Sequence, residues 1–569
     1  MTRVSLRSGG AGAKGSAPVL AAQDGVGFDV QLAPRRPAPG SWRAASGALA
    51  VLALLSFAGA AAAQAPFAPG LRWTRAATNG DPWIPRSVAF GASDAVVWTS
   101  ATGTAPNLAL LAASAEGATG PLAREDQVAS AISVLSVAAG SAADACFGVA
   151  QYPAPDATHR RTEVTRYSPA AAAQGGAFAP AWTRTLPSIV NGPARIACDE
   201  RGARVAVALW NDGAHAVHVE LLDGASGAVL GAHDLAATSL SELALSADGR
   251  RVAISAGGVL WIGDDAASTL ASIAAPVATR ALSFSGDGAL LAAGAGAALS
   301  VYAEGANGYA LAFAVPGAQN ELATRAELAR DGSTLAIGWW DALTGVDLRL
   351  EVFDPASRAP LWSVAQHGTP GGLQNLPEVV RVSADGRRIA LGAWGDGSSA
   401  PELRLFDRAS PTPVLTADLP GSVTALALDA SGTRVAVGLK NTHANQFATT
   451  GQFRLYDTGE RDVAVRGTPT VGGTLDLAAR VPGASEVLFL FGVRAPAPTR
   501  VPGTLGELFL RRTRLLVVPV AADADGRAEL AHPIDADPAL RGRVLHVQAA
   551  GRVNGVLQLS RTVVDPLLW

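Results

Sequence analysis

The 569-residue sequence predicts an all-β protein, an eight-bladed β-propeller followed by a small β-sandwich domain. Three observations lead to this fold class. A pair of strands around a tight acidic turn recurs along the chain, a second strand-end motif accompanies most copies, and the repeat stops well before the C-terminus. We therefore expect a disordered N-region with a signal peptide over residues 1–63, a propeller over 70–462 and a β-sandwich over 466–569.

The recurring unit consists of two runs of alternating apolar residues that flank an Asp-Gly turn. The clearest copies are Leu243–Ser255 and Val380–Gly392, which turn at Gly249 and Gly386. Glycine tolerates positive φ, so two strands can reverse direction within a few residues. Successive turns lie roughly 40–55 residues apart, the length of a four-stranded blade, and such blades bury their faces by stacking. Further copies turn at Asp199, Asp287, Asp331 and Asp429, and degenerate ones near Asp94 and Asp144.

The end of the repeat predicts how the ring closes. In most copies the third strand ends in an aspartate, as at Asp354 and Asp407, and a fourth strand follows. The eighth unit stops at Asp457, after its third strand. Leu71–Arg75 resembles the outer strand of the second unit, so we expect it to supply the missing fourth strand and remove the free sheet edges. Seven blades are the alternative, if the first two units form one irregular blade.

The first 63 residues have the pattern of a secretory signal. A basic stretch ending at Arg43 precedes the apolar run Ala48–Ala60 and a small-residue cleavage site ending at Ala63. The apolar run is shorter than the ~20 residues that span a bilayer, so we expect cleavage, with an uncleaved anchor as the alternative. Cleavage predicts an exported protein, in the periplasm, at the cell surface or outside the cell, with no membrane span.

Charge restricts the class of partner. Six of the 45 basic and two of the 48 acidic residues lie in residues 1–63, so the remaining chain has a net charge of −7. Nucleic acids and anionic membrane surfaces require a basic face, and we expect neither as a partner. The sequence predicts a monomer that binds an unidentified protein, peptide or glycan.

The repeats resemble those of known exported propellers. The Ser-x-Asp-Gly units are similar to those of bacterial WD40-like and YVTN-type propellers, and Asp354–Trp362 resembles a blade motif of quinoprotein-like propellers. This resemblance covers roughly residues 70–460 and implies architecture rather than activity. The segments Gly467–Leu477, Asp523–Gly526 and Pro533–Gly542 resemble a C-terminal module of exported bacterial proteins, in which Asp523–Gly526 is expected to form a hairpin turn.

The sequence contains no recognisable catalytic, cofactor or metal motif. It lacks a Gly-x-Ser-x-Gly elbow, a His-Glu-x-x-His pair and a phosphate-binding loop. One carboxylate per Asp-Gly turn is too few for calcium, which takes about six to eight oxygen ligands. We therefore expect no enzyme activity and no cofactor, and a binding or scaffold function. A quinoprotein-type oxidoreductase and a structural envelope component are the alternatives.

Two small sets of residues are candidates for sites. Cys146 and Cys198 fall in neighbouring units of an exported chain, which makes them a candidate disulfide, although two buried free thiols are the favoured interpretation. Trp339, Trp340 and Trp394 follow strands at one end of the ring, among Gly and Asp residues. Packing between blades is the expected role of most tryptophans, and these three are the best candidates for exposure on a binding face.

Overall fold

The computed structural model describes most of the chain after the leader. Within that part the chain is built from β-strands, with a short 3₁₀ helix, η1 (Pro538–Leu540). In the described part no helical segment has the length and apolar character needed to cross a membrane. The described residues are 2–4 and 69–568, apart from 79–81, 92–95, 104–107, 115–122, 128–132, 141–144, 154–159, 168–179, 190–192, 212–213, 265–269, 275–279, 295, 399, 460, 467 and 514.

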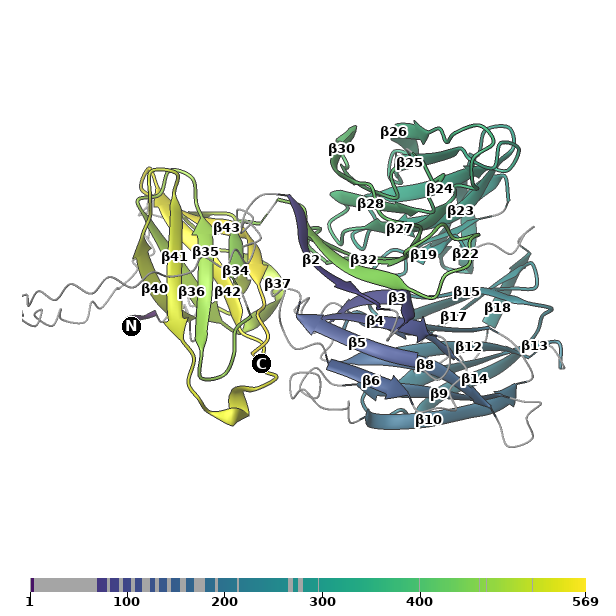
Figure 1. The fold of residues 1–569 in the computed structure, drawn as a ribbon, viewed down its shortest axis with the longest axis horizontal. Coiled ribbons are helices and arrows are strands. Elements are labelled where there is room, and N and C mark those ends of the chain that lie inside the picture. The colour runs from purple at the N-terminus through teal and green to yellow at the C-terminus, as the bar shows by residue number, and fades with distance from the viewer. Residues whose placement is uncertain are drawn as a thin grey trace, which may run out of the picture.

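Strands from Gly70 to Asp457 form eight four-stranded antiparallel sheets, the blades of a propeller (Figure 1). Each of the first seven blades uses four consecutive strands. The first four blades are β3 (Trp83–Gly91), β4 (Val96–Gly103), β5 (Leu108–Ser114) and β6 (Ala123–Gln127); β7 (Ser133–Ala138), β8 (Cys146–Pro153), β9 (Arg160–Tyr167) and β10 (Pro180–Ile189); β11 (Ala194–Cys198), β12 (Arg204–Asn211), β13 (Ala216–Asp223) and β14 (Val229–Ala236); and β15 (Leu240–Leu245), β16 (Arg251–Ala256), β17 (Val259–Asp264) and β18 (Leu270–Ala274).

The last four blades follow the same plan until the eighth, which takes its outer strand from the other end of the chain. They are β19 (Leu282–Phe284), β20 (Leu290–Gly294), β21 (Ala298–Gly305) and β22 (Gly308–Pro316); β23 (Glu321–Leu328), β24 (Leu335–Asp341), β25 (Leu348–Asp354) and β26 (Ala359–Gln366); β27 (Pro377–Val382), β28 (Arg388–Ala393), β29 (Leu403–Asp407) and β30 (Ser410–Ala417); and β31 (Val423–Leu428), β32 (Arg434–Lys440), β33 (Gly451–Asp457) and β2 (Gly70–Ala76).

The inner strands make the ring continuous. Each first strand contacts the first strand of the next blade, in the order β3, β7, β11, β15, β19, β23, β27 and β31, and β31 contacts β3 again. The first two units form separate blades, so the described strands of the ring make eight blades rather than the alternative seven. Apolar side chains fill the space between blades, as Leu350 and Val352 of the sixth blade pack against Ile389 and Leu391 of the seventh.

The Asp-Gly turns hold neighbouring blades together as well as reversing the chain. At the seventh blade, the Ser383 hydroxyl donates to Asp385 at 2.6 Å and accepts from the backbone N–H of Arg388 at 2.9 Å. Gly386 has a φ of 70°. Its carbonyl accepts a 2.8 Å hydrogen bond from Thr334 of the sixth blade, and a Cβ at this position would lie 2.6 Å from the same hydroxyl. Both the backbone conformation and the close approach therefore require glycine here.

The predicted closure is confirmed. Strand β2 pairs with β33 in an antiparallel register, and Trp73 of β2 packs edge-on against Phe453 with ring centroids 5.1 Å apart. The buried carboxylate of Asp457 lies 3.1 Å from a guanidinium nitrogen of Arg72 on β2 and 2.6 Å from Nε of Arg461 in the following linker. One aspartate therefore joins the two ends of the propeller and the segment that leaves it.

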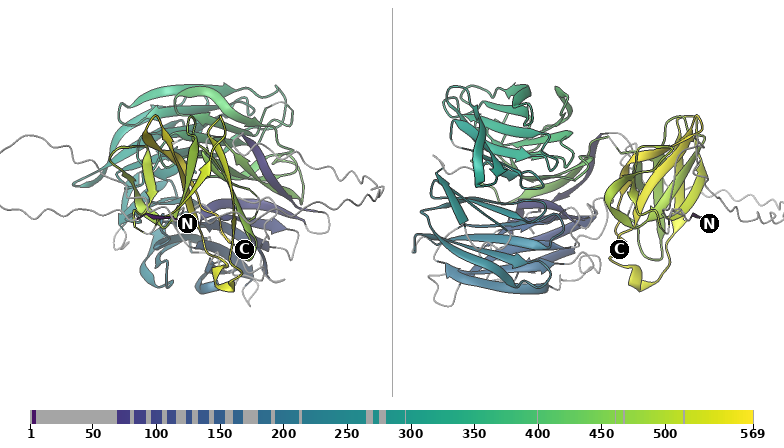
Figure 2. Two further views of the ribbon diagram at one scale, coloured as in Figure 1. Left: turned by 90° about the vertical axis from the view of Figure 1, so that its left-hand side faces the viewer. Right: turned by 180° about the vertical axis from the view of Figure 1, so that it is seen from behind.

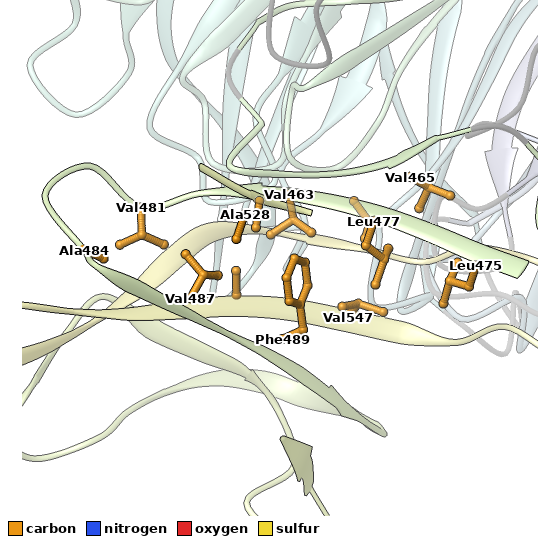
Figure 3. Packing of buried hydrophobic residues seen from close by; sticks show 13 residues of the cluster. Val463, Val465, Leu475, Leu477, Val481, Ala484, Val487, Phe489, Ala528 and Val547 are labelled. Carbon is orange, nitrogen blue, oxygen red and sulfur yellow. The ribbon is translucent and has the colours of Figure 1, made fainter. Parts of the chain in front are cut away.

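The C-terminal residues form a β-sandwich, which stands beside the propeller as a separate unit (Figures 1 and 2). Its core contains Val463 and Leu477 from one sheet and Val487, Phe489 and Val547 from the other (Figure 3). The three sheets are β34 (Val463–Arg466), β35 (Thr474–Arg480) and β41 (Arg527–Pro533); β1 (Thr2–Val4), β40 (Leu515–Ala521), β36 (Glu486–Gly492), β42 (His546–Val553), β43 (Val556–Val564) and β38 (Thr504–Leu505); and β37 (Arg494–Arg500) with β39 (Glu507–Leu510).

Two details differ from the sequence-based expectation. The turn Asp523–Gly526 joins β40 and β41, which belong to different sheets, so the hairpin prediction is wrong: the chain crosses from one layer of the sandwich to the other here. In the leader, Thr2–Val4 form strand β1, which pairs antiparallel with β40. The signal sequence itself lies outside the described residues, and its cleavage stays a prediction.

Candidate binding site at the mouth of the central channel

The inner strands of all eight blades surround a central channel with a volume of about 1170 Å³. One end of the ring carries the Asp-Gly turns, and the chain leaves the propeller for the sandwich at this end, after Asp457. The other end carries the loops between second and third strands and the connections between blades. We call this second opening the mouth.

Charged side chains enter the channel near the mouth because the inner strands are irregular there. The ladder between β23 and β24 shifts register between Ala323 and Arg325, and the ladder between β27 and β28 shifts between Pro377 and Val379. Such bulges redirect side chains that would otherwise follow the regular alternation of a strand. Arg325 and Glu378 both line the channel.

Glu378 connects the charged groups of neighbouring blades. Its Oε1 accepts a 2.9 Å hydrogen bond from Nη2 of Arg325 and lies 3.7 Å from Nη1 of Arg280. Its Oε2 accepts a 3.0 Å hydrogen bond from the indole N–H of Trp394. A second pair, Arg195 and Glu242, has a separation of 3.7 Å. Each carboxylate at this level is therefore already engaged by at least one cation.

Cations outnumber carboxylates among the described side chains that line the mouth. Among the described residues that line the channel at this level, five cations face two carboxylates: Arg86, Arg195, Arg280, Arg325 and Lys440 against Glu242 and Glu378. Burial lowers the pKa of Arg325 and of Arg195, and the nearby charge of Arg280 contributes in the same direction. Burial likewise lowers the pKa of Lys440, with a contribution from Arg86. The cations are thus close enough to repel one another.

Deeper in the channel the charges are balanced by pairing. Arg381 contacts Glu327 at 2.7 Å, and Arg330 contacts Glu200 at 2.5 Å. Both pairs join residues of different blades and line the channel below the mouth. The excess of positive charge is therefore confined to the mouth level.

A loop of the eighth blade forms part of the rim. It runs from Asn441 to Thr450 between β32 and β33, and the Nε2–H of His443 donates a 2.7 Å hydrogen bond to the carbonyl of Gln374 in the neighbouring blade. Lys440 donates to the Ala444 carbonyl at 3.1 Å. Ala444 and Ala448 line the channel, and between them the Phe447 side chain is 91% exposed. The rim thus presents an exposed aromatic ring next to the cationic mouth.

The three candidate tryptophans occupy different environments. Trp394 is half-buried, lines the channel and packs edge-on against His443, with ring centroids 6.0 Å apart. Trp340 is also half-buried and donates to the Gly345 carbonyl at 3.2 Å.

Trp339 does not line a binding face, and its predicted exposure is wrong. Its side chain is fully buried in the core between the fifth and sixth blades, and its indole donates to Glu351 at 3.0 Å. The ring extends the apolar face that Leu335 and Ile337 present on the same strand. The alternative, packing between blades, therefore describes this residue.

The candidate disulfide is not formed, and both cysteines are free thiols. Cys146 is fully buried in the second blade, whereas Cys198 is less buried and lines the channel. Burial raises the pKa of both thiols, the neighbouring thiol of Cys198 raises the pKa of Cys146 further, and the nearby carboxylate of Asp199 raises that of Cys198 further. Neither thiol is activated as a nucleophile.

Within the described residues, no group of three or more His, Cys, Asp or Glu side chains is arranged to hold a metal ion. A second cleft, of about 410 Å³, lies between the sixth and seventh blades at the Asp-Gly end. Its charges alternate in sign, with Asp385 and Asp407 beside Arg387 and Arg408. The mouth differs from this cleft because cations outnumber carboxylates among its described lining residues.

The cationic mouth was not predicted from the sequence. A signal for it is present, because single charged residues interrupt apolar inner strands shortly before the turns, as at Arg195, Arg325 and Glu378. The repeated Asp-Gly turns identify the blades, whereas these residues differ from blade to blade. A comparison of equivalent positions across the repeats would have singled them out.

The chain was also compared with known proteins. No protein-family model matches the chain, and no curated protein matches it. A solved structure described as the Dos1 propeller is similar, with a TM-score of 0.47 and 11% sequence identity over 69% of this chain and 96% of that chain. The chain is a β-propeller with additional C-terminal β-sheets.

Proposed function

We propose that this chain is an exported, non-enzymatic binding protein that holds a protein, peptide or glycan at the mouth of its channel. The observation that supports this most is the local excess of positive charge in a chain that is acidic after residue 63. Binding sites on propellers lie on loops and channel openings because the blades themselves are used for packing.

The rim strengthens the proposal. Phe447 is 91% exposed, and an apolar side chain of this size at a concave opening is a typical anchor for a partner. The mouth also faces away from the end at which the chain enters the sandwich, so a partner can approach it while the sandwich serves for attachment or display.

The proposal can be tested by capture with matched variants. The purified protein and two variants are immobilised and exposed to envelope and secreted fractions of the producing cells. The mouth variant combines Arg280→Ala with Phe447→Ala. The control is Arg250→Ala, which removes an arginine with a 75% exposed side chain at the Asp-Gly end.

We expect a stoichiometric partner to be retained by the wild type and the Arg250→Ala control and to be lost from the mouth variant. Equal capture by all three proteins would show that binding takes place elsewhere on the surface. Recovery of no partner from either fraction would favour a purely structural protein.

A further inference from the structure

We infer that the chain, once residues 1–63 are removed, forms a two-fold symmetric dimer in which the β40 edge strands of two sandwiches pair in antiparallel fashion. The partner at this surface is thus a second copy of the chain, in place of the monomer expected from the sequence. The inference goes beyond the proposed function and does not depend on what the mouth binds.

Strand β40 has the composition of an interior strand but lies near the edge of its sheet, followed only by the leader strand β1. Its run Leu515–Val518 is apolar throughout. Leu515 and Val517 belong to a buried cluster on one face, and Val518 packs against the sandwich core on the other. Strands covered on both faces are typical of the middle of a sheet. The edge strand β41 of the other sheet, in contrast, carries charged residues such as Glu529, which protect an exposed edge.

The outer edge of β40 offers backbone groups to a further strand. Successive residues of an antiparallel strand direct their N–H and C=O groups to opposite neighbours. Ala522 donates its N–H to the Ser485 carbonyl, on the β36 side, at 2.9 Å, and the register between β36 and β40 is continuous. Leu515 and Val517, an odd number of residues away, therefore direct theirs away from β36. Strand β1 pairs with them in antiparallel register, so a strand fits this edge, and removal of the leader vacates it.

Charge complementarity selects a second copy of this chain as the partner. Arg511 and Arg512 precede β40, and Asp523 and Asp525 follow it. All four are exposed, and the ion pairs within the described part of the sandwich join other residues. Antiparallel pairing about a two-fold axis places the arginines before one strand beside the aspartates after the other, at both ends of the pair. These contacts fix the register and disfavour strands that lack the same charges.

The position of the sandwich leaves this edge accessible. Strand β40 lies on the side of the sandwich that faces away from the propeller (Figures 1 and 2). Two copies can therefore join through their sandwiches, with the sheets that remain without β1 forming one continuous sheet, while both propellers point outwards. Such a dimer presents two mouths, so a partner with repeated binding segments would be held with increased avidity.

Sedimentation velocity tests the inference. The sample is the protein purified from exporting cells, after mass spectrometry has located its N-terminus. Concentrations of roughly 5–100 µM are used, because one strand pair buries less than the ~1,600 Å² of a standard interface and implies micromolar affinity. Two interface variants each reverse one charge, Arg511→Glu and Asp525→Arg. The control, Arg250→Glu, makes the same kind of change on the propeller, at a side chain that is 75% exposed.

We expect a monomer–dimer equilibrium for the wild type and the control, and at least fivefold weaker dimerisation for each interface variant alone. Mixing the two interface variants should restore dimerisation, because the two reversed charges then face each other at one end of the pair while the other end has its original charges. Amide exchange in Leu515–Val518 should slow as the concentration of the wild type rises, and should not do so in Arg511→Glu.

Four results would overturn the inference. They are retention of residues 1–63 in the exported protein, a monomer throughout the concentration range, interface variants that dimerise as tightly as the wild type, and a mixture that associates no more tightly than either variant alone. The last comparison also separates a lost contact from misfolding, since a misfolded variant cannot be rescued by its partner.

Discussion

A single buried carboxylate joins the two ends of the ring, and Asp457→Asn tests how much it contributes to closure. In the sixth blade the equivalent residue, Asp354, precedes a turn that leads directly into the fourth strand, so the chain itself holds that strand in place. In the eighth blade the fourth strand, β2, comes from the other end of the chain. Arg72 of β2 is held by Asp457, and so is Arg461 of the linker.

The loss of stability expected for Asp457→Asn follows from the burial of the three charged side chains. The Asp457 side chain is fully buried, and those of Arg461 and Arg72 are only 6% and 17% exposed. Asparagine retains the oxygen that accepts from the Gly459 N–H at 2.8 Å, but it removes the negative charge that contacts both guanidinium groups. Removing one partner of a buried ion pair costs about 3–5 kcal/mol, and we expect a loss of free energy of unfolding in this range.

Urea denaturation and hydrogen exchange measure this effect. Asp354→Asn is the matched control, because the Asp354 side chain is 27% exposed and that of its ion-pair partner Arg408 is 34% exposed, so its loss should cost about 1 kcal/mol or less. Amide exchange in β2 should accelerate in Asp457→Asn and stay unchanged in the control. If the two variants lose equal stability, or if β2 remains protected in Asp457→Asn, the ion pairs do not hold the ring closed.

Three further predictions concern buried groups. Trp339→Ala should lower the free energy of unfolding by about 3–5 kcal/mol in urea denaturation, because it leaves a cavity between two blades. Burial raises the pKa of Glu402 from 4.5 to about 7, so the folded state binds its proton more tightly and stability should fall as the pH rises through this range; Glu402→Gln should remove that part of the pH dependence. The thiols of Cys146 and Cys198 should react with Ellman's reagent far more slowly in the folded protein than in urea, since burial raises the pKa of both. Rapid reaction of both in the folded state would contradict their burial.

The sequence predicts the fold well because the signals for it are local. A glycine that must have positive φ, as Gly386 does, determines where two strands reverse, and the spacing of such turns determines the number of blades. The incomplete eighth unit, which ends at Asp457, predicts closure by the N-terminal strand. Pairing of β2 with β33 confirms this.

The site was harder to predict because the exposure of its side chains depends on which face of each strand the neighbouring blade covers. The second strand of each blade is packed on both faces, so alternation does not separate exposed from buried positions there. Trp339 continues the face of Ile337 and is buried. Trp394 follows the last residue of β28, outside the ladder, and its indole can therefore reach Glu378.

Residues at equivalent core positions are similar from blade to blade, whereas residues that line the channel differ. The residue six positions before the turn glycine is apolar in six blades, namely Ile196, Leu243, Leu282, Ala326, Val380 and Leu426. The residues seven or eight positions before that glycine include Arg195, Glu242, Arg280, Arg325, Glu378 and Thr424. Side chains six positions before the turn glycine pack between blades, so the fold restricts them to apolar types. Side chains seven or eight positions before it face an open channel, and the fold alone does not account for their charge. Substitutions among these channel residues should therefore alter binding much more than stability, whereas substitutions of the apolar residue one or two positions further along the strand should do the reverse.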